Sequence, residues 1–212
     1  MLILAVIAAY AAAYLLGSVN SAVIISKLLY GDDVRNYGSG NAGTTNMLRT
    51  YGAKAAGLTF LGDVLKGVIA VWLARFIFNA MGFGNEAVYA AYTAAFCSMM
   101  GHMFPIYFRF KGGKGVATGL GAVFTINPLI FGILFPIGLA VAGFSGFVSL
   151  CSLTGAVLFP IFVAIMSVKN TGSVDVLELI LALVLALLVI YNHRENIKRL
   201  LSGTENKFYK KK

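Results

Sequence analysis

A polar, glycine-rich segment at residues 38–49 carries the side chains best suited to chemistry: Gly-Ser-Gly-Asn-Ala-Gly-Thr-Thr-Asn-Met-Leu-Arg. Its glycines let the backbone turn tightly and bring N–H groups close to a ligand. Ser39, Asn41, Thr44, Thr45 and Asn46 add polar side chains, and Arg49 adds a planar cation. This inventory predicts a site for a phosphate or another oxyanion.

A second polar cluster, residues 111–119, reads Lys-Gly-Gly-Lys-Gly-Val-Ala-Thr-Gly and opens an apolar run. Glycines before a helix start present free N–H groups and a positive helix terminus, and Lys111 and Lys114 add mobile cations. The cluster is not a phosphate-binding Walker A loop, because the four-residue spacer before Gly-Lys is missing. The alternative interpretation is a basic turn at the membrane boundary.

A third cluster, residues 192–199, reads Asn-His-Arg-Glu-Asn-Ile-Lys-Arg and ends the last apolar run. If the helix continues through it, His193 and Asn196 share one face at a spacing of three residues. This pair is a candidate for the site. The alternative is an ordinary interfacial anchor with a charged, solvated end.

Five further polar residues give weaker signals. Asp63 and Lys66 are three residues apart inside an apolar run, and ionisable groups there are usually paired, so we favour a structural ion pair over a site role for Lys66. His102 is expected to pack in the core, although its proximity to Arg109 leaves a site role open. Ser149 and Ser152 indicate little alone, because such serines usually bond to backbone carbonyls.

The composition places these clusters in a membrane. The 212 residues are 59% hydrophobic and 12% charged, whereas soluble domains are about 45–50% apolar and about 25% charged. Two cysteines in apolar runs, Cys97 and Cys151, predict neither a metal site nor a disulfide framework. Apolar runs long enough for membrane spans, with one short exception, occupy residues 2–25, 55–78, 87–108, 116–126, 129–147, 148–168 and 176–191.

We therefore expect an all-α integral membrane protein, a single bundle of about seven transmembrane helices. Residues 1–212 would form one domain, with a mobile basic tail at 205–212. Lys and Arg gather around the three polar clusters, which predicts that these face the cytoplasm, with the N-terminus outside and the C-terminus inside. The short fourth run, 116–126, has a re-entrant half-helix as its alternative.

The basic residues lie at membrane boundaries, which makes nucleic-acid binding a poor explanation of the net charge of +9. A transporter of phosphorylated metabolites is one rival function, but it predicts cations near the bilayer midplane and often an internal repeat. A membrane scaffold that binds anionic lipid is another, but it does not explain the glycine-rich segments.

The chain resembles the bacterial acyl-phosphate:glycerol-3-phosphate acyltransferase family (PlsY type). The matching segments run in order along the chain: residues 38–46 with Arg49, 63–67, 101–105, 111–118, 148–150 and 193–197. The resemblance implies a seven-helix enzyme of the bacterial plasma membrane, active at the cytoplasmic face early in phospholipid synthesis. It would transfer a fatty acyl group from acyl phosphate to glycerol 3-phosphate, giving lysophosphatidic acid and phosphate. Neither coenzyme A nor acyl carrier protein would be a direct donor, and no cofactor or metal is expected.

The resemblance also implies residue roles. The expected catalytic residues are Lys114, His193, Arg49 and Ser39. The acyl phosphate would be bound by Gly38, Ser39, Gly40, Asn41, Gly43, Thr44, Thr45 and Asn46. Glycerol 3-phosphate would be bound by Arg49, Lys114, Ser152, His193 and Asn196. Lys66, His102, Lys111 and Ser149 remain secondary candidates.

The proton acceptor is open at this point. His193 is a geometric candidate for the general base. The family instead suggests that a substrate phosphate takes the proton, and we favour this because phosphate is abundant in the reaction and the sequence offers no obvious carboxylate to orient His193. The His-x-x-x-x-Asp pair of other glycerolipid acyltransferases is absent, since Tyr107 and Lys198 follow the two histidines at that spacing. No covalent acyl-enzyme is expected, although Ser39 is a conceivable nucleophile.

Overall fold

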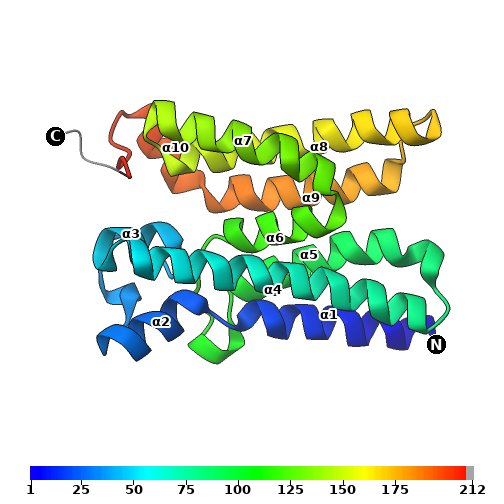
Figure 1. Cartoon of the computed structure of the whole chain (residues 1–212), viewed down its shortest axis with the longest axis horizontal. Coiled ribbons are helices and arrows are strands. Elements are labelled where there is room, and N and C mark those ends of the chain that lie inside the picture. Colours follow the sequence, from blue (N-terminus) through cyan, green and yellow to red (C-terminus); the bar gives the residue numbers. More distant parts are fainter. Residues whose placement is uncertain (209–212) are drawn as a thin grey trace. The chain divides into compact units, whose positions relative to one another are not determined.

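The computed structural model describes residues 1–208, which fold into helices with no strand in that range (Figure 1). The chain divides into two compact units, unit 1 (Met1–Ile126) and unit 2 (Asn127–Lys212). Unit 1 contains α1 (Leu2–Ser18), α2 (Ser21–Tyr30), α3 (Thr44–Tyr51), α4 (Ala53–Ala80), α5 (Ala87–Met103), α6 (Val116–Ile126) and the 3-10 helices η1 (Val34–Asn36), η2 (Gly84–Glu86) and η3 (Ile106–Phe108). Unit 2 contains α7 (Pro128–Ser145), α8 (Val148–Thr171), α9 (Val176–Asn192) and α10 (Arg194–Leu201). The all-α prediction is confirmed, whereas the single domain stays a prediction.

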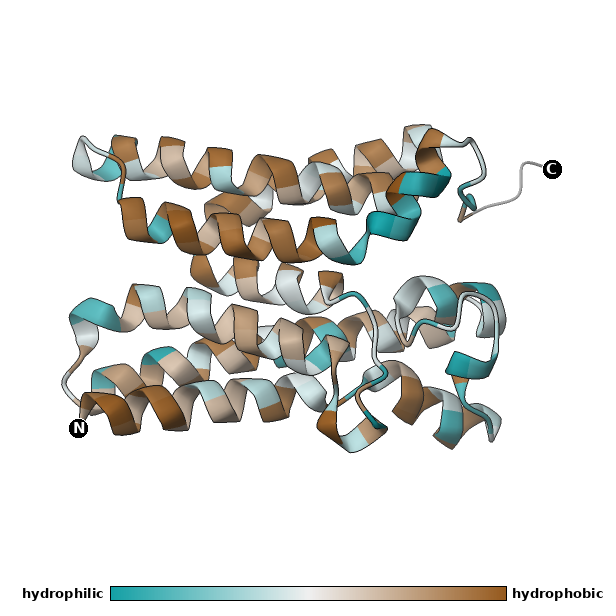
Figure 2. Ribbon diagram, turned by 180° about the vertical axis from the view of Figure 1, so that it is seen from behind, coloured by the Kyte–Doolittle hydropathy of each residue, from teal (hydrophilic) through white to brown (hydrophobic). Residues whose placement is uncertain are grey.

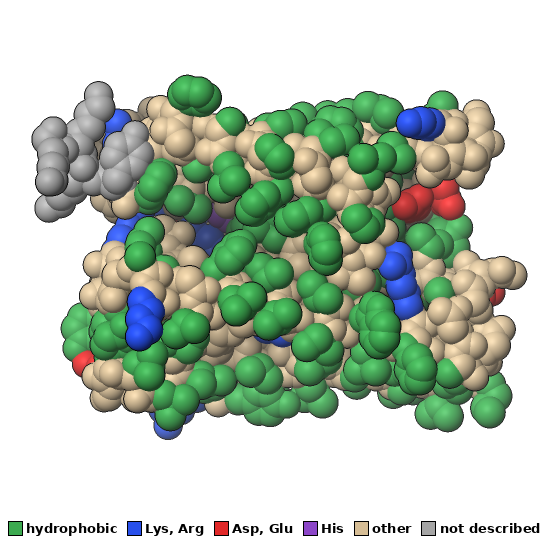
Figure 3. All heavy atoms as spheres, in the orientation of Figure 1, with side chains coloured by type: hydrophobic (Ala, Val, Ile, Leu, Met, Phe, Trp, Pro, Cys, Tyr) green, Lys and Arg blue, Asp and Glu red, His purple; other side chains and the backbone are tan. Residues whose placement is uncertain are grey.

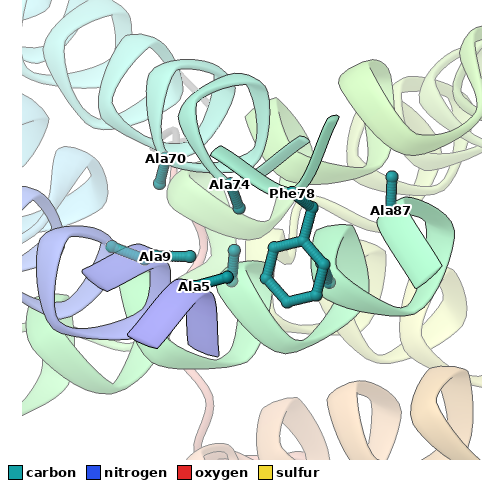
Figure 4. Packing of buried hydrophobic residues seen from close by; sticks show 9 residues of the cluster. Ala5, Ala9, Ala70, Ala74, Phe78 and Ala87 are labelled. Atoms are coloured by element: carbon teal, nitrogen blue, oxygen red, sulfur yellow. The ribbon is translucent and has the colours of Figure 1, made fainter. Parts of the chain in front are cut away.

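Small residues allow the helices of unit 1 to pack closely. α1 lies against α4 and α5, and α4 also packs on α6. Alanines four residues apart on α1, beginning with Ala5 and Ala9, meet Ala70, Ala74 and Phe78 of α4 (Figure 4). Without a hydrophobic driving force inside a bilayer, such close backbone approach is a main source of helix association.

The helix of the first apolar run is interrupted, although Leu2–Tyr30 as a whole is long and apolar enough to form the expected first span. α1 ends at Ser18, and Asn20 caps α2 by accepting a hydrogen bond from the Val23 N–H at 3.1 Å. The break exposes the carbonyl of Val19, which accepts a hydrogen bond from Lys66 Nζ at 2.8 Å. A polar cap and a buried lysine therefore make an interruption tolerable inside an apolar stretch.

The third apolar run is shorter than the expected 87–108, because α5 ends at Met103. Pro105 has no N–H to continue the helical ladder and restricts Phe104 before it, so the chain leaves the helix here. By contrast, the short fourth run forms α6 with the expected bounds.

Unit 2 is built from α7 packed on α8 and α8 packed on α9. Asn127 and Asp175 cap α7 and α9, and Gly146 ends α7 in a left-handed conformation. The last helix does not continue straight through the third polar cluster, because α9 and α10 are bent by 59° at His193. Residues 205–208 of the expected mobile tail are held by contacts to the unit, among them Phe208 N–H to Gly146 O at 3.0 Å; residues 209–212 lie outside the described range.

The outer faces of the helices are apolar, as a membrane protein requires. Figure 2 shows hydrophobic residues along α1, α7, α8 and α9 and hydrophilic ones in α10 and the loops. The face displayed in Figure 3 is covered mainly by hydrophobic side chains, with scattered Lys and Arg. By length and composition, three described helical segments can cross a membrane, Leu2–Tyr30, Pro128–Ser145 and Val148–Thr171, and the bent pair α9–α10 is a fourth candidate. Seven spans and their sidedness stay predictions.

Candidate active site

Asn46 organises the glycine-rich segment of unit 1. It lies in the first turn of α3 and is almost fully buried. Its Oδ1 accepts a hydrogen bond from the Ser39 N–H at 3.0 Å, and its Nδ2 donates to the carbonyls of Val34 and Tyr37 at 3.1 and 3.0 Å. Gly38 has a φ of +57°, and a Cβ there would overlap Asn46 Oδ1. The amide of Asn46 therefore shapes loop A, which we define as residues 37–43.

The backbone donors of loop A are mostly used within the fold. The Gly40 N–H bonds to Tyr37 O, the Gly43 N–H to Asn41 O, and the Ala42 N–H to Gly112 O. The start of α3 differs, because its N-cap is Gly43, which has no side chain to cap the first turn. The Oγ1 of Thr44 is buried there without a hydrogen-bond partner among the described residues. The N–H groups of a first helical turn lack intrahelical acceptors, so this position suits an anion.

Loop B, residues 109–115, lies against loop A, which agrees with the prediction that the first two polar clusters share one face. The Gly112 carbonyl accepts the Ala42 N–H at 3.4 Å, and the Gly113 N–H donates to His102 O at 3.2 Å. A Cβ on Gly113 would overlap His102 Nε2 and lie 2.6 Å from Ala42 O. Lys114 is half-buried at the end of this loop, whereas Lys111 is exposed. Arg49 is exposed on the last turn of α3.

A buried polar cluster in the same unit joins Asp63, Lys66 and His102. Lys66 Nζ lies 2.9 Å from Asp63 Oδ1 and 2.8 Å from His102 Nδ1. Because an ammonium only donates, Nδ1 accepts this bond and the proton of a neutral ring resides on Nε2. This Nε2 is the atom next to Gly113. The expected ion pair between Asp63 and Lys66 is confirmed, and it also orients the histidine behind loop B.

His193 of unit 2 lies at the bend between α9 and α10 and is almost fully buried. Its Nδ1 is 2.8 Å from the carbonyl of Val189. A carbonyl only accepts, so Nδ1 carries the proton and Nε2 of the neutral ring is the basic nitrogen. The backbone thus supplies the orienting group that the sequence did not reveal.

Glu205 is a residue that sequence reasoning missed. Its carboxylate accepts hydrogen bonds from Asn196 Nδ2 at 2.7 Å, Ser149 Oγ at 2.9 Å and Arg199 Nε at 2.7 Å. Burial works to raise the pKa of Glu205, but the hydrogen bonds from Asn196, Arg199 and Ser149 outweigh it, and the pKa lies below its ordinary value. One available signal was an acidic residue within an otherwise basic tail.

The structure therefore brings together loop A, loop B, Lys66 and His102 within unit 1, and Ser149 and Asn196 within unit 2. Ser152 is buried and donates to Val148 O at 3.0 Å, the backbone bond expected of a helical serine. One site drawing on all three polar clusters stays a prediction.

Comparison with known proteins assigns these residues to a family. The family model described as "Glycerol-3-phosphate acyltransferase" matches residues 7–203. The chain is 46% identical over 200 residues to the glycerol-3-phosphate acyltransferase of Clostridioides difficile (strain 630), covering 94% of each chain. It is 44% identical over 200 residues to that of Bordetella pertussis (strain Tohama I), covering 94% of this chain and 90% of the relative.

Two solved structures extend the likeness to the fold. PlsY (YgiH), an integral membrane glycerol 3-phosphate acyltransferase, in its glycerol 3-phosphate form is 40% identical, with a TM-score of 0.82 and coverage of 96% of both chains. Its lysophosphatidic acid form is 38% identical, with a TM-score of 0.79 and coverage of 95% of this chain and 94% of that one. The extent of these matches includes loop A, loop B and the bend at His193, and the chain belongs to the glycerol-3-phosphate acyltransferase family of integral membrane enzymes.

Proposed function

We propose that this enzyme transfers a fatty acyl group from acyl phosphate to glycerol 3-phosphate at the cytoplasmic face of a bacterial plasma membrane. The products are lysophosphatidic acid and inorganic phosphate. The observation that carries the donor assignment is the start of α3 beside glycine-rich loop A. The helix there has no side-chain cap, and the Thr44 hydroxyl has no hydrogen-bond partner among residues 1–208. Helix N-termini favour phosphate groups through their N–H groups and dipole.

The acceptor assignment is supported by the solved PlsY structure in its glycerol 3-phosphate form. In this chain we assign glycerol 3-phosphate to Arg49, Lys114, Ser152, His193 and Asn196. Cations suit a phosphomonoester, and Arg49 can bind it with two parallel hydrogen bonds. The lysophosphatidic acid form of PlsY fits the proposed product.

The proposed reaction is a direct displacement at the acyl carbonyl. The glycerol hydroxyl attacks the carbonyl carbon, and the bond between that carbon and the phosphate oxygen breaks. Phosphate leaves, and the acyl group is then bonded to glycerol. The hydroxyl proton passes to a substrate phosphate. Holding both anions together supplies proximity, and fixed donors stabilise the charge that develops on the leaving phosphate.

The purified enzyme in lipid, supplied with radiolabelled glycerol 3-phosphate and either acyl phosphate, acyl coenzyme A or acyl carrier protein, tests the donor. Acylated product and equimolar phosphate release from acyl phosphate alone are expected. Equal or faster transfer from either thioester would contradict the proposal.

Alanine variants test the assigned cations. Arg49→Ala and Lys114→Ala should each lower turnover at least about 100-fold, since removing one donor to developing charge typically costs about 10²–10³ in rate. Lys54→Ala, which removes a cation just beyond α3 at the start of α4, is the matched control and should keep near-normal turnover. Normal turnover in both site variants, with the protein folded, would refute the site.

A further inference from the structure

Arg35 joins the two glycine-rich loops through hydrogen bonds from its guanidinium. It lies in η1, directly before loop A. Its Nη1 donates to the carbonyl of Phe108 at 2.9 Å and to the carbonyl of Lys111 at 3.0 Å. These two carbonyls bracket the turn that opens loop B. A residue just before the first polar cluster thus binds the start of the second cluster, 76 residues later in the chain.

Asp33 fixes the orientation of the Arg35 guanidinium. Its Oδ1 accepts from Arg35 Nε at 2.9 Å and its Oδ2 accepts from Nη2 at 2.7 Å, which leaves Nη1 pointing to loop B. Asp33 Oδ1 also accepts the backbone N–H of Arg35 at 3.1 Å. Paired bonds of this kind confer geometric specificity as well as energy. Hydrogen bonding from Arg35 accordingly holds the pKa of Asp33 below its ordinary value.

The turn held by Arg35 has an unusual backbone. Arg109 and Phe110 both have a φ of +57°, and among the described residues they are the non-glycine positions with positive φ. Side chains disfavour this left-handed conformation, so it persists only where surrounding contacts enforce it. The bonds from Arg35 to the carbonyls on both sides are such contacts.

Loop A is linked to the residue next to Arg35 in the chain. Val34, the neighbour of Arg35, accepts the hydrogen bond from Asn46 Nδ2 that shapes loop A. Loop B in turn meets loop A through Gly112 O and the Ala42 N–H. Displacement of Arg35 would therefore alter the spacing between the start of α3 and Lys114.

We propose that Arg35, oriented by Asp33, is a positioning residue that sets the register between loop A and loop B for acyl transfer. The proposal rests on the proposed function, because the register matters only if the loops hold substrate phosphates. Arginine is required by geometry: a lysine ammonium has a charge, but it lacks the planar fork that bonds one carboxylate and two carbonyls together.

Arg75 provides a matched control within the same unit. It lies near the C-terminal end of α4. Its guanidinium likewise donates to two carbonyls, Thr125 O at 2.7 Å and Ile126 O at 3.3 Å. Arg75→Gln removes a comparable clamp without touching either loop. Arg35→Lys and Arg35→Gln are compared with it, together with Asp33→Asn.

We expect Arg35→Lys and Arg35→Gln to lower kcat with acyl phosphate about 10- to 100-fold, since a displacement of about 1 Å can cost that much. Arg75→Gln should keep kcat within about twofold at a similar loss of thermal stability. Asp33→Asn should lower kcat less, and combining it with Arg35→Gln should add little further loss. Normal kcat in Arg35→Lys, or an equal loss in Arg75→Gln, would overturn the proposal; if Arg35→Gln fails to fold, Arg35→Lys decides.

Limited trypsin cleavage tests the positioning role of Arg35 independently of the identity of the acyl donor. Loop B contains the trypsin sites Arg109, Lys111 and Lys114. Loss of the Arg35 hydrogen bonds should loosen loop B and speed cleavage at these sites, whereas the cleavage rate of Arg75→Gln should equal that of wild type. Unchanged cleavage in the Arg35 variants would overturn the positioning role even if acyl phosphate is the donor. Faster cleavage would support it even if the wild-type enzyme used another donor.

Discussion

The amide of Asn46, in the first turn of α3, accepts a hydrogen bond from the Ser39 N–H of loop A at 3.0 Å. The same amide donates to the carbonyls of Val34 and Tyr37, so these three hydrogen bonds fix the conformation of loop A. Asn46 was expected to bind acyl phosphate directly. Its described hydrogen bonds hold loop A beside the start of α3, and direct binding of acyl phosphate by Asn46 stays a prediction.

Replacement of Asn46 by Asp should disable loop A. The carboxylate still accepts from Ser39, but it places oxygen atoms opposite the carbonyls of Val34 and Tyr37. Loss of two buried hydrogen bonds should cost about 2–4 kcal/mol of unfolding free energy, taking about 1–2 kcal/mol for each. Thermal unfolding and acyl-transfer assays measure both effects. Asn36→Ala, at an amide with a long 3.4 Å bond to Asp32, is the control and should leave both nearly unchanged.

Removal of one partner from the buried Asp63–Lys66 pair should destabilise the fold far more than removal of both partners. Lys66→Met leaves the Asp63 charge and the Val19 carbonyl without the ammonium, at a cost of about 3–5 kcal/mol. Asp63→Leu combined with Lys66→Met should recover part of that loss in thermal unfolding. Activity should not recover, because His102 loses the bond that orients its ring behind loop B. Full activity in the double variant would show that this orientation is irrelevant.

The attachment of Glu205 should weaken in acid. Its folded-state pKa lies below the ordinary value of 4.5, so ionised Glu205 stabilises the fold above that value and loses its contribution as pH falls through the folded-state pKa. Wild type should therefore unfold at a higher temperature than Glu205→Gln at neutral pH, and the difference should shrink below about pH 4.5.

Glu195→Gln is the matched control for this measurement. Glu195 is exposed and pairs only with Lys198 among the described ion pairs, at 3.2 Å. Such surface pairs contribute about 0–1 kcal/mol, so this variant should follow wild type at every pH. A constant difference between wild type and Glu205→Gln across the acid range would contradict the assigned charge state.

His193→Ala should separate a binding role from a proton-transfer role. With a substrate phosphate as proton acceptor, the variant should mainly raise KM for glycerol 3-phosphate, and its turnover at saturation should fall less than about 10-fold. A general base normally contributes about 10²–10⁴ in rate, so a loss of turnover at saturation of about 100-fold or more would identify His193 as the base. Steady-state kinetics over both substrates measures the two parameters.

Much of the fold could be predicted because its causes are local. Apolar runs of membrane length become helices wherever they occur, and α6 and α8 begin at the expected residues. The differences from expectation arose where single residues ended or capped a helix inside an apolar run, as Pro105 does after α5. Asn20 and Lys66 interrupt the first run, and neither hydropathy nor periodicity registers a lysine that satisfies a carbonyl 47 residues earlier.

The sequence by itself determined the membrane class, the family and the residue types of the glycine-rich loops, because these depend on composition and on the order of motifs. Only the tertiary structure decided which groups those residues contact. It turned Asn46 inward, set the protonated nitrogens of His102 and His193, docked Glu205 and brought Arg35 to loop B. Hydrogen-bond partners depend on distance and direction in space. Two residues of the same type can therefore have entirely different partners in the fold.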